Sequence, residues 1–156
     1  KLPEEKVAAL WLAGLLCQTP EYGLQASPAA LAELGFYPRI DHLLWRGQSS
    51  LLLPLLDEWR LNICEELTRR YGVEWPLEWA TAPNEEEQLA VINTPLATQW
   101  GHLQLAITNS PKRLPSRLPG RVYFARKLRN DLAHYHPVEY ERYVQLVELM
   151  STPDFP

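Results

Sequence analysis

The chain has 156 residues, of which 46% are hydrophobic and 22% charged, a composition that excludes a disordered chain and allows a sizeable core. No apolar run reaches the roughly 18–20 residues of a membrane-spanning helix, and Val7–Cys17, the richest run, lacks the basic start of a signal peptide. The net charge of −4 argues against bulk affinity for nucleic acids, and Cys17 and Cys64 are expected to be free, buried thiols of a reducing, cytoplasmic compartment.

The first half of the chain is predicted to be helical, because apolar residues recur at three- and four-residue spacing and no segment alternates as a strand would. Ser27 followed by Pro28 is typical of a helix start, and Gly35 and Gly72 are typical of positions just beyond a helix end. Pro54 lies near the start of the longest helix, where a proline does least harm. The predicted helices and turns are Pro3–Gln18, Ala29–Leu34, Asp41–Trp45 and Ser49/Ser50–Tyr71, with Trp45 and Trp59 as core candidates.

In the second half, Val73–Pro83 is predicted as an irregular loop, in which Trp75 and Trp79 either stack on bases or fold onto the protein. Asn84 caps the next helix, which is kinked or restarted at Thr94-Pro95 before it continues through Ile107. A loop at Ser110–Gly120, a helix at about Arg121–His134 and a last helix opened by Pro137 follow, and Tyr140, Val144, Val147 and Met150 of the last helix are expected to face the core.

These elements predict an all-α fold, a helical bundle of four main helices plus short helices in a single domain over residues 1–156. Because the chain begins with Lys1 and not with Met, excision of this domain from a longer protein stays open.

The charge is distributed unevenly along the chain. No acid occurs between Glu87 and Asp131, so residues 88–130 carry +7 while the remainder carries −11. Such a basic segment indicates a phosphate-binding surface, or else it pairs with the acidic remainder within the chain or across a dimer.

The basic segment ends in the stretch LRNDLAHYHP, residues 128–137. The chain contains no phosphate-binding glycine loop, no nucleophile elbow and no Cys/His cluster with zinc spacing, so no metal ligand and no cofactor are predicted. On a helix Asn130 and His134 share a face, and a long arginine at position 129 can reach the same region. An arginine fork binds phosphate, while a histidine at a helix C-terminus is suited to proton transfer, so the pair favours RNA cleavage in which the ribose 2′-OH attacks the phosphorus.

The residues Arg129–His134, RNDLAH, resemble the Arg-x4–6-His signature of the HEPN superfamily, in which a polar residue often follows the arginine. That family's fold is a helical bundle with this motif near the end of a late helix. The resemblance implies a metal-independent endoribonuclease of single-stranded RNA, built as a homodimer whose motif helices form one cleft. It implies Arg129 and His134 as the catalytic pair and Asn130 as a positioning residue. The candidate contacts to RNA phosphates around them are Arg126, Arg121, Arg117, Lys127 and His136.

Other functions stay open. The chain can be an inactive HEPN-like module for dimerisation or partner binding in a larger defence or RNA-processing protein. It can also be a toxin that an antitoxin keeps silent. In an unrelated bundle, His134 would only cap the last carbonyls of its helix, and His136 would only precede the next one.

Overall fold

The computed structural model describes residues 3–155, which form eight α-helices, one 3₁₀ helix and one two-stranded sheet. The fold is mostly helical, in agreement with the predicted all-α class. Contacts divide the chain into two compact units, one ending at Arg46 and the other beginning at Gly47. The single domain over residues 1–156 stays a prediction. Within the described part, no helix combines the length and the apolar composition that crossing a membrane requires.

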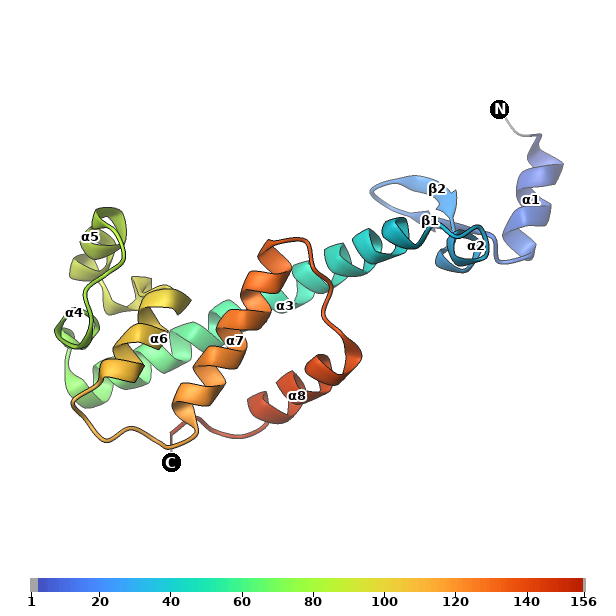
Figure 1. Ribbon diagram of the computed structural model, residues 1–156. Helices are drawn as coiled ribbons and strands as arrows, with labels where there is room; N and C mark the ends of the chain where they lie inside the picture. The colour runs from blue at the N-terminus through green and yellow to red at the C-terminus, as the bar shows by residue number, and fades with distance from the viewer. Residues whose placement is uncertain (1–2, 156) are drawn as a thin grey trace. The chain divides into compact units, whose positions relative to one another are not determined.

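The unit that ends at Arg46 contains the sheet. Its elements are α1 (Glu4–Leu12), β1 (Leu16–Thr19), β2 (Gly23–Ala26), α2 (Pro28–Glu33) and the first part of α3 (Tyr37–Tyr71) (Figure 1). The predicted helix over Pro3–Gln18 was wrong beyond Leu12, because Gly14 adopts a left-handed φ of 71° and ends α1. The following residues pair as an antiparallel hairpin, with Thr19 opposite Gly23, whose φ of 64° closes the turn.

Helix α3 is longer than predicted, because the turn near Asp41 and the helix from Ser49 or Ser50 are parts of one 35-residue helix. Pro54 therefore lies in the interior of the helix and not in its first turn. Its buried face runs from Leu52 to Leu67 and includes Trp59, one of the two predicted core candidates, whereas the other, Trp45, is half-buried.

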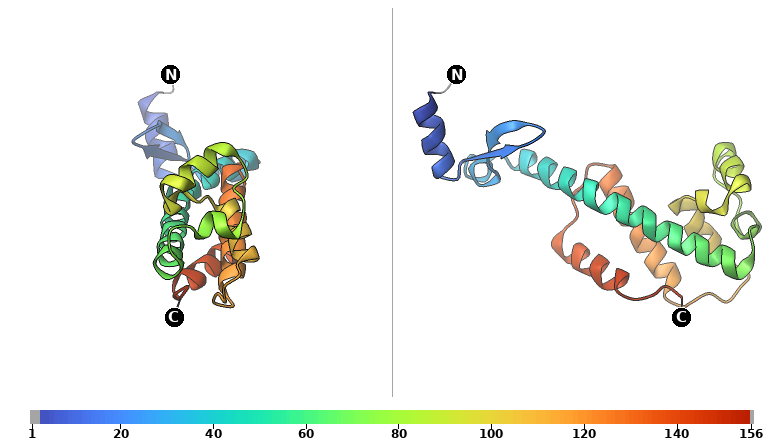
Figure 2. Two further views of the ribbon diagram at one scale, coloured as in Figure 1. Left: turned by 90° about the vertical axis from the view of Figure 1, so that its left-hand side faces the viewer. Right: turned by 180° about the vertical axis from the view of Figure 1, so that it is seen from behind.

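The unit that begins at Gly47 holds the remaining helices, shown from three sides in Figures 1 and 2. They are α4 (Trp75–Trp79), α5 (Glu85–Asn93), the 3₁₀ helix η1 (Pro95–Ala97), α6 (Trp100–Asn109), α7 (Leu118–Ala133) and α8 (Tyr140–Met150). The predicted break at Thr94-Pro95 is confirmed as a restart, since α5 ends at Asn93 and Thr94 caps η1. Helix α7 begins three residues earlier than expected, with Pro119 in its first turn.

The core of this unit lies between α3, α6 and α7. Ring contacts mark their packing: Trp59 of α3 meets Trp100 of α6 edge-on, with centroids 6.3 Å apart, and also lies against Arg121 of α7. The prediction that α8 turns Tyr140, Val147 and Met150 to the core was wrong, because these three side chains are exposed. Leu146 is the buried residue of α8 within the described chain.

The tryptophans of the predicted loop at Val73–Pro83 belong to helix α4 and are buried. Trp75 donates a hydrogen bond from Nε1 to Thr68 Oγ1 (3.1 Å), and its ring centroid lies 5.5 Å from that of Trp79. Their exposures of 0% and 4% leave no face for a base, so they fold onto the protein.

Both cysteines are free, as predicted. Cys64 is buried, and this burial raises the pKa of its thiol to about 12, which makes it unreactive. Cys17 is half-buried and lies in β1 rather than in a helix.

Candidate functional site

The candidate site lies at the C-terminal end of α7, where the backbone turns sharply. The buried side chains of Leu128 and Leu132 anchor this end of the helix in the core. Tyr135 follows the cap residue His134 with a φ of 65°, in the left-handed region. The N–H of His136 donates to the carbonyl of Asp131 (2.9 Å) and that of Tyr135 to the carbonyl of Leu132 (3.4 Å), which is the Schellman pattern of helix termination.

A glutamine holds the chain beyond this turn. The side chain of Gln48, in α3, donates from Nε2 to the carbonyl of Val138 (2.8 Å) and accepts from the N–H of Val138 at Oε1 (2.6 Å). Both main-chain groups of the buried Val138 are thereby paired. The loop that carries His134 and His136 is therefore fixed at both ends, by α7 and by Gln48.

The three predicted catalytic residues are all accessible at this helix end. Arg129 is exposed and donates from Nη1 to Oδ1 of the half-buried Asn130 (3.3 Å). The N–H of His134 donates to the carbonyl of Asn130 (3.0 Å), which places the two residues one helical turn apart on the same side. His134 is exposed, and within residues 3–155 its imidazole makes no hydrogen bond or ion pair.

Asp131, the acidic residue of the motif, is paired with an arginine of α8. Asp131 forms an ion pair with Arg142, and both side chains are about a quarter exposed. The guanidinium of Arg142 also lies 5.9 Å from the centroid of the Phe124 ring. Because Arg142 compensates its charge, the carboxylate of Asp131 repels a bound anion less than an unpaired carboxylate would.

Four of the five predicted phosphate contacts are at least partly exposed. Lys127, Arg117 and His136 are exposed, while Arg126 is half-buried and donates from Nη1 to Gln104 Oε1 (2.9 Å). A cavity of about 280 Å³ lies between α6 and α7, and its lining is polar: Gln104, Tyr123, Arg126, Lys127, Asn130 and Asp131. Arg129 lines a separate hollow with residues of α3, including Asp57.

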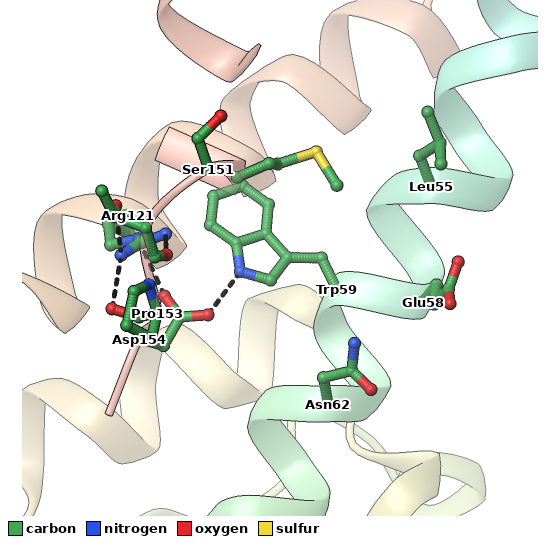
Figure 3. Close-up of a pocket in the computed structure, with 10 residues that line it drawn as sticks. Leu55, Glu58, Trp59, Asn62, Arg121, Ser151, Pro153 and Asp154 are labelled. Carbon is green, nitrogen blue, oxygen red and sulfur yellow. Dashed lines mark hydrogen bonds and ion pairs between the residues drawn. The ribbon is translucent and has the colours of Figure 1, made fainter. Parts of the chain in front are cut away.

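Arg121, the fifth predicted phosphate contact, is placed differently. Its side chain is 4% exposed and points at the segment after α8 (Figure 3). It donates from Nη1 to the carbonyl of Pro153 (3.1 Å) and from Nη2 to the carbonyl of Thr152 (2.6 Å), and it also reaches the carbonyl of Leu149. Its acceptors are thus supplied by the protein, so Arg121 does not belong to the candidate site.

Asp154 completes the surroundings of Arg121. Its Oδ1 lies 2.8 Å from Nε of Arg121, and its Oδ2 accepts from Trp59 Nε1 (2.6 Å). Burial raises the pKa of this carboxyl, against the opposing effects of the Trp59 hydrogen bond and the Arg121 charge. A cavity of about 330 Å³ lies beside this pair, lined also by Glu58 and Asn62 (Figure 3). The sequence did not predict this cavity, because the residues that line it come from segments far apart along the chain.

Within residues 3–155, no three side chains of histidine, cysteine, aspartate or glutamate are grouped so as to hold a metal ion. No family model, no curated protein and no solved structure matches the chain.

Proposed function

We propose that the end of α7 is the active site of a HEPN-type endoribonuclease that cleaves single-stranded RNA without a metal ion. The observation that carries the proposal is the accessibility of Arg129 and His134. In a scaffold, these side chains would be expected to cap backbone carbonyls or pair with carboxylates. Instead, among the described residues, the side chain of Arg129 hydrogen-bonds only to the amide of Asn130 and forms no ion pair, and the imidazole of His134 is exposed to solvent.

The chemistry assigns a role to each group. The neutral imidazole of His134 takes the proton of the ribose 2′-OH while the 2′ oxygen bonds to phosphorus. The bond from phosphorus to the 5′ oxygen breaks, which leaves a 2′,3′-cyclic phosphate and a 5′-hydroxyl end. Arg129 donates to the phosphate oxygens as their negative charge grows, and Asn130 holds the guanidinium.

In-line displacement places the attacking and leaving oxygens on opposite sides of the phosphorus. In a homodimer that joins two α7 ends, the imidazole of the second copy protonates the leaving 5′ oxygen. The proposal therefore includes a dimer with one composite cleft, and an antitoxin or the rest of a larger protein can occupy or expose this cleft.

The experiment is RNA cleavage in excess EDTA. We expect His134→Ala and Arg129→Ala each to lower the cleavage rate by about 10²–10⁴-fold, because each removes a group that acts in the transition state. His42→Ala and Arg39→Ala, which change exposed residues of α3 outside the site, are the matched controls and should cleave like the wild type. Equal inactivity of all proteins at high concentration, or cleavage that needs added metal, would rule the proposal out.

A second function is favoured by a different observation, the exposed apolar stripe on α8. Tyr140, Tyr143 and Val147 follow one another at helical spacing and are 75%, 45% and 47% exposed. A non-catalytic dimerisation module would use this stripe and leave RNA intact. A chain that is dimeric but inert toward RNA would support this function over the nuclease.

A further inference from the structure

We propose that the cavity between α6 and α7 binds one base of the RNA, and that Tyr123 is the residue on which this base stacks. The inference rests on the proposed function, because it names a substrate-binding position next to the proposed cleavage site. It is carried by the placement of Tyr123, by the charges of the cavity and by the line of residues that leads from it to His134.

The cavity residues of α7 lie on one face of the helix. Arg126, Lys127 and Asn130 follow Tyr123 at spacings of three, four and seven residues, and each of them lines the cavity. His134 continues the same row one turn beyond Asn130. The rise along the helix from Tyr123 to Asn130 is about 10 Å, so the ring lies about two helical turns from Asn130.

Tyr123 presents its ring to solvent over this cavity. It is 56% exposed and makes no hydrogen bond, ring contact or cation–π contact with the described residues. The large aromatic residues of the core differ, since Trp59, Trp75, Trp79 and Trp100 are each at most 5% exposed. An aromatic ring that is fixed on a rigid helix and left open is suited to stacking on a base.

The charges of the cavity favour a nucleic-acid strand despite the net charge of the chain. Lys127 is exposed, and Arg126 is held toward α6 by its bond to Gln104. Asp131 is the one acid of the lining, and it is paired with Arg142. Two cations beside an aromatic ring form the combination by which proteins bind single strands, with the cations on the phosphates and the ring on the base.

A second polar group faces the base. The half-buried Gln104 accepts from Arg126 at Oε1, and within residues 3–155 its Nε2 makes no hydrogen bond. This amide N–H can donate to an acceptor on the edge of the stacked base. Because every base has a π face and an edge acceptor, the site should add affinity without requiring one sequence.

The test measures binding and cleavage separately. Binding is measured with the full chain carrying His134→Ala, which keeps the probe intact, and with a 5′-labelled single-stranded RNA at low salt. We expect Tyr123→Ala to raise the Kd at least about tenfold, whereas Tyr123→Phe, which keeps the ring, should stay within about twofold. Tyr37→Ala, at an exposed tyrosine outside the cavity, is the control and should bind as the parent does.

The role of charge is tested with Lys127→Ala, which should weaken binding. Because each phosphate contact contributes about one to the slope of log K against log salt concentration, that slope should become shallower by about one. An abasic site in the probe should remove the difference between Tyr123 and Tyr123→Ala. An unchanged Kd in Tyr123→Ala, or an equal loss in Tyr123→Phe, overturns the stacking site.

The two proposals fail in different ways. If the wild type cleaves RNA and Tyr123→Ala binds normally, the stacking site is overturned and the nuclease stands. If binding depends on the Tyr123 ring while the wild type never cleaves, the nuclease is overturned and RNA binding at this cavity is supported. If no RNA binds, both are overturned.

Discussion

Three arginines of α7, Arg121, Arg126 and Arg129, occupy three different environments. Arg121 is buried and bonded to the chain after α8, Arg126 is half-buried against Gln104, and Arg129 is exposed next to Asn130. A guanidinium keeps its charge when it leaves water, so a buried one must find acceptors in the protein. This requirement gives Arg121 a structural role and leaves Arg129 available for a phosphate.

Arg121→Met is expected to lower the free energy of unfolding by about 3–5 kcal/mol, because the carboxylate of Asp154 and the carbonyls of Leu149 and Thr152 lose their donor. Arg117→Met, at an exposed arginine just before the same helix, should change it by at most about 0.5 kcal/mol. Urea denaturation of both variants measures the difference. Equal stabilities would show that water replaces the Arg121 guanidinium.

At the scale of single residues, the sequence predicts only those contacts of the site that join residues close together in the chain. The contact of Arg129 with Asn130 joins adjacent residues, and the shared face of Asn130 and His134 follows from helical spacing. The acceptors of Arg121 lie 28 to 33 residues further along the chain, so no local pattern could separate this arginine from the exposed ones.

At the scale of elements, the link between α7 and α8 determines where His134 and His136 lie. The Schellman turn directs the chain away from α7, and Gln48 then fixes Val138. Gln48 and Val138 are 90 residues apart in the sequence, so no local sequence pattern could predict their contact. The imidazoles therefore project from a loop that is held at both ends.

Gln48→Leu tests this link. The substitution keeps the approximate size of the side chain but leaves the N–H and C=O of the buried Val138 without partners, which should cost about 1–3 kcal/mol. Gln145→Leu, at an exposed glutamine of α8, is the control. Faster hydrogen exchange at the Val138 amide, together with slower RNA cleavage, is the expected result. Unchanged exchange at that amide would contradict it.

Helices with strong caps were predicted well, and those that depend on tertiary packing were not. Asn84 accepts from the N–H of Glu87 at 2.8 Å and starts α5 where expected. The hairpin after α1 was missed, because its strands of four residues each are too short to show an alternating pattern. Helix α4 was missed because Trp75-Pro76 suggested a loop, whereas Pro76 lies in the first turn of the helix.

For the whole molecule, burial is concentrated in one of the two units. Among residues 3–155, Ser27 and Ala30 are the buried residues of the unit that ends at Arg46, and the rest belong to the unit from Gly47 onward. The buried residues of the described chain therefore lie almost entirely in the unit from Gly47 onward. The mostly helical character was predictable from composition and spacing, but this uneven burial was not, because both halves contain apolar residues at similar intervals.

Association of two chains is the prediction at this scale. We expect a homodimer by analytical ultracentrifugation. Because the catalytic dimer joins two α7 ends, Tyr143→Asp combined with Val147→Asp on the α8 stripe should leave the chain dimeric, whereas monomers would favour the non-catalytic module. RNA cleavage should be lost with the dimer, since the composite cleft needs both copies. Leu89→Asp, which adds a charge at an exposed leucine of α5, should leave the dimer intact. A monomeric wild type that still cleaves RNA would exclude the shared cleft.

The hydrogen bonds of Arg121 also depend on residues that are synthesised later than the helices around it. The guanidinium is buried, but its acceptors all lie in the segment from Leu149 to Asp154. A ribosome completes α3, α6 and α7 before it adds these residues, so the helices that surround Arg121 exist before its acceptors do. A chain that ends just before Leu149 would thus keep every residue of the RNDLAH motif and lack all the acceptors that Arg121 has in the described structure.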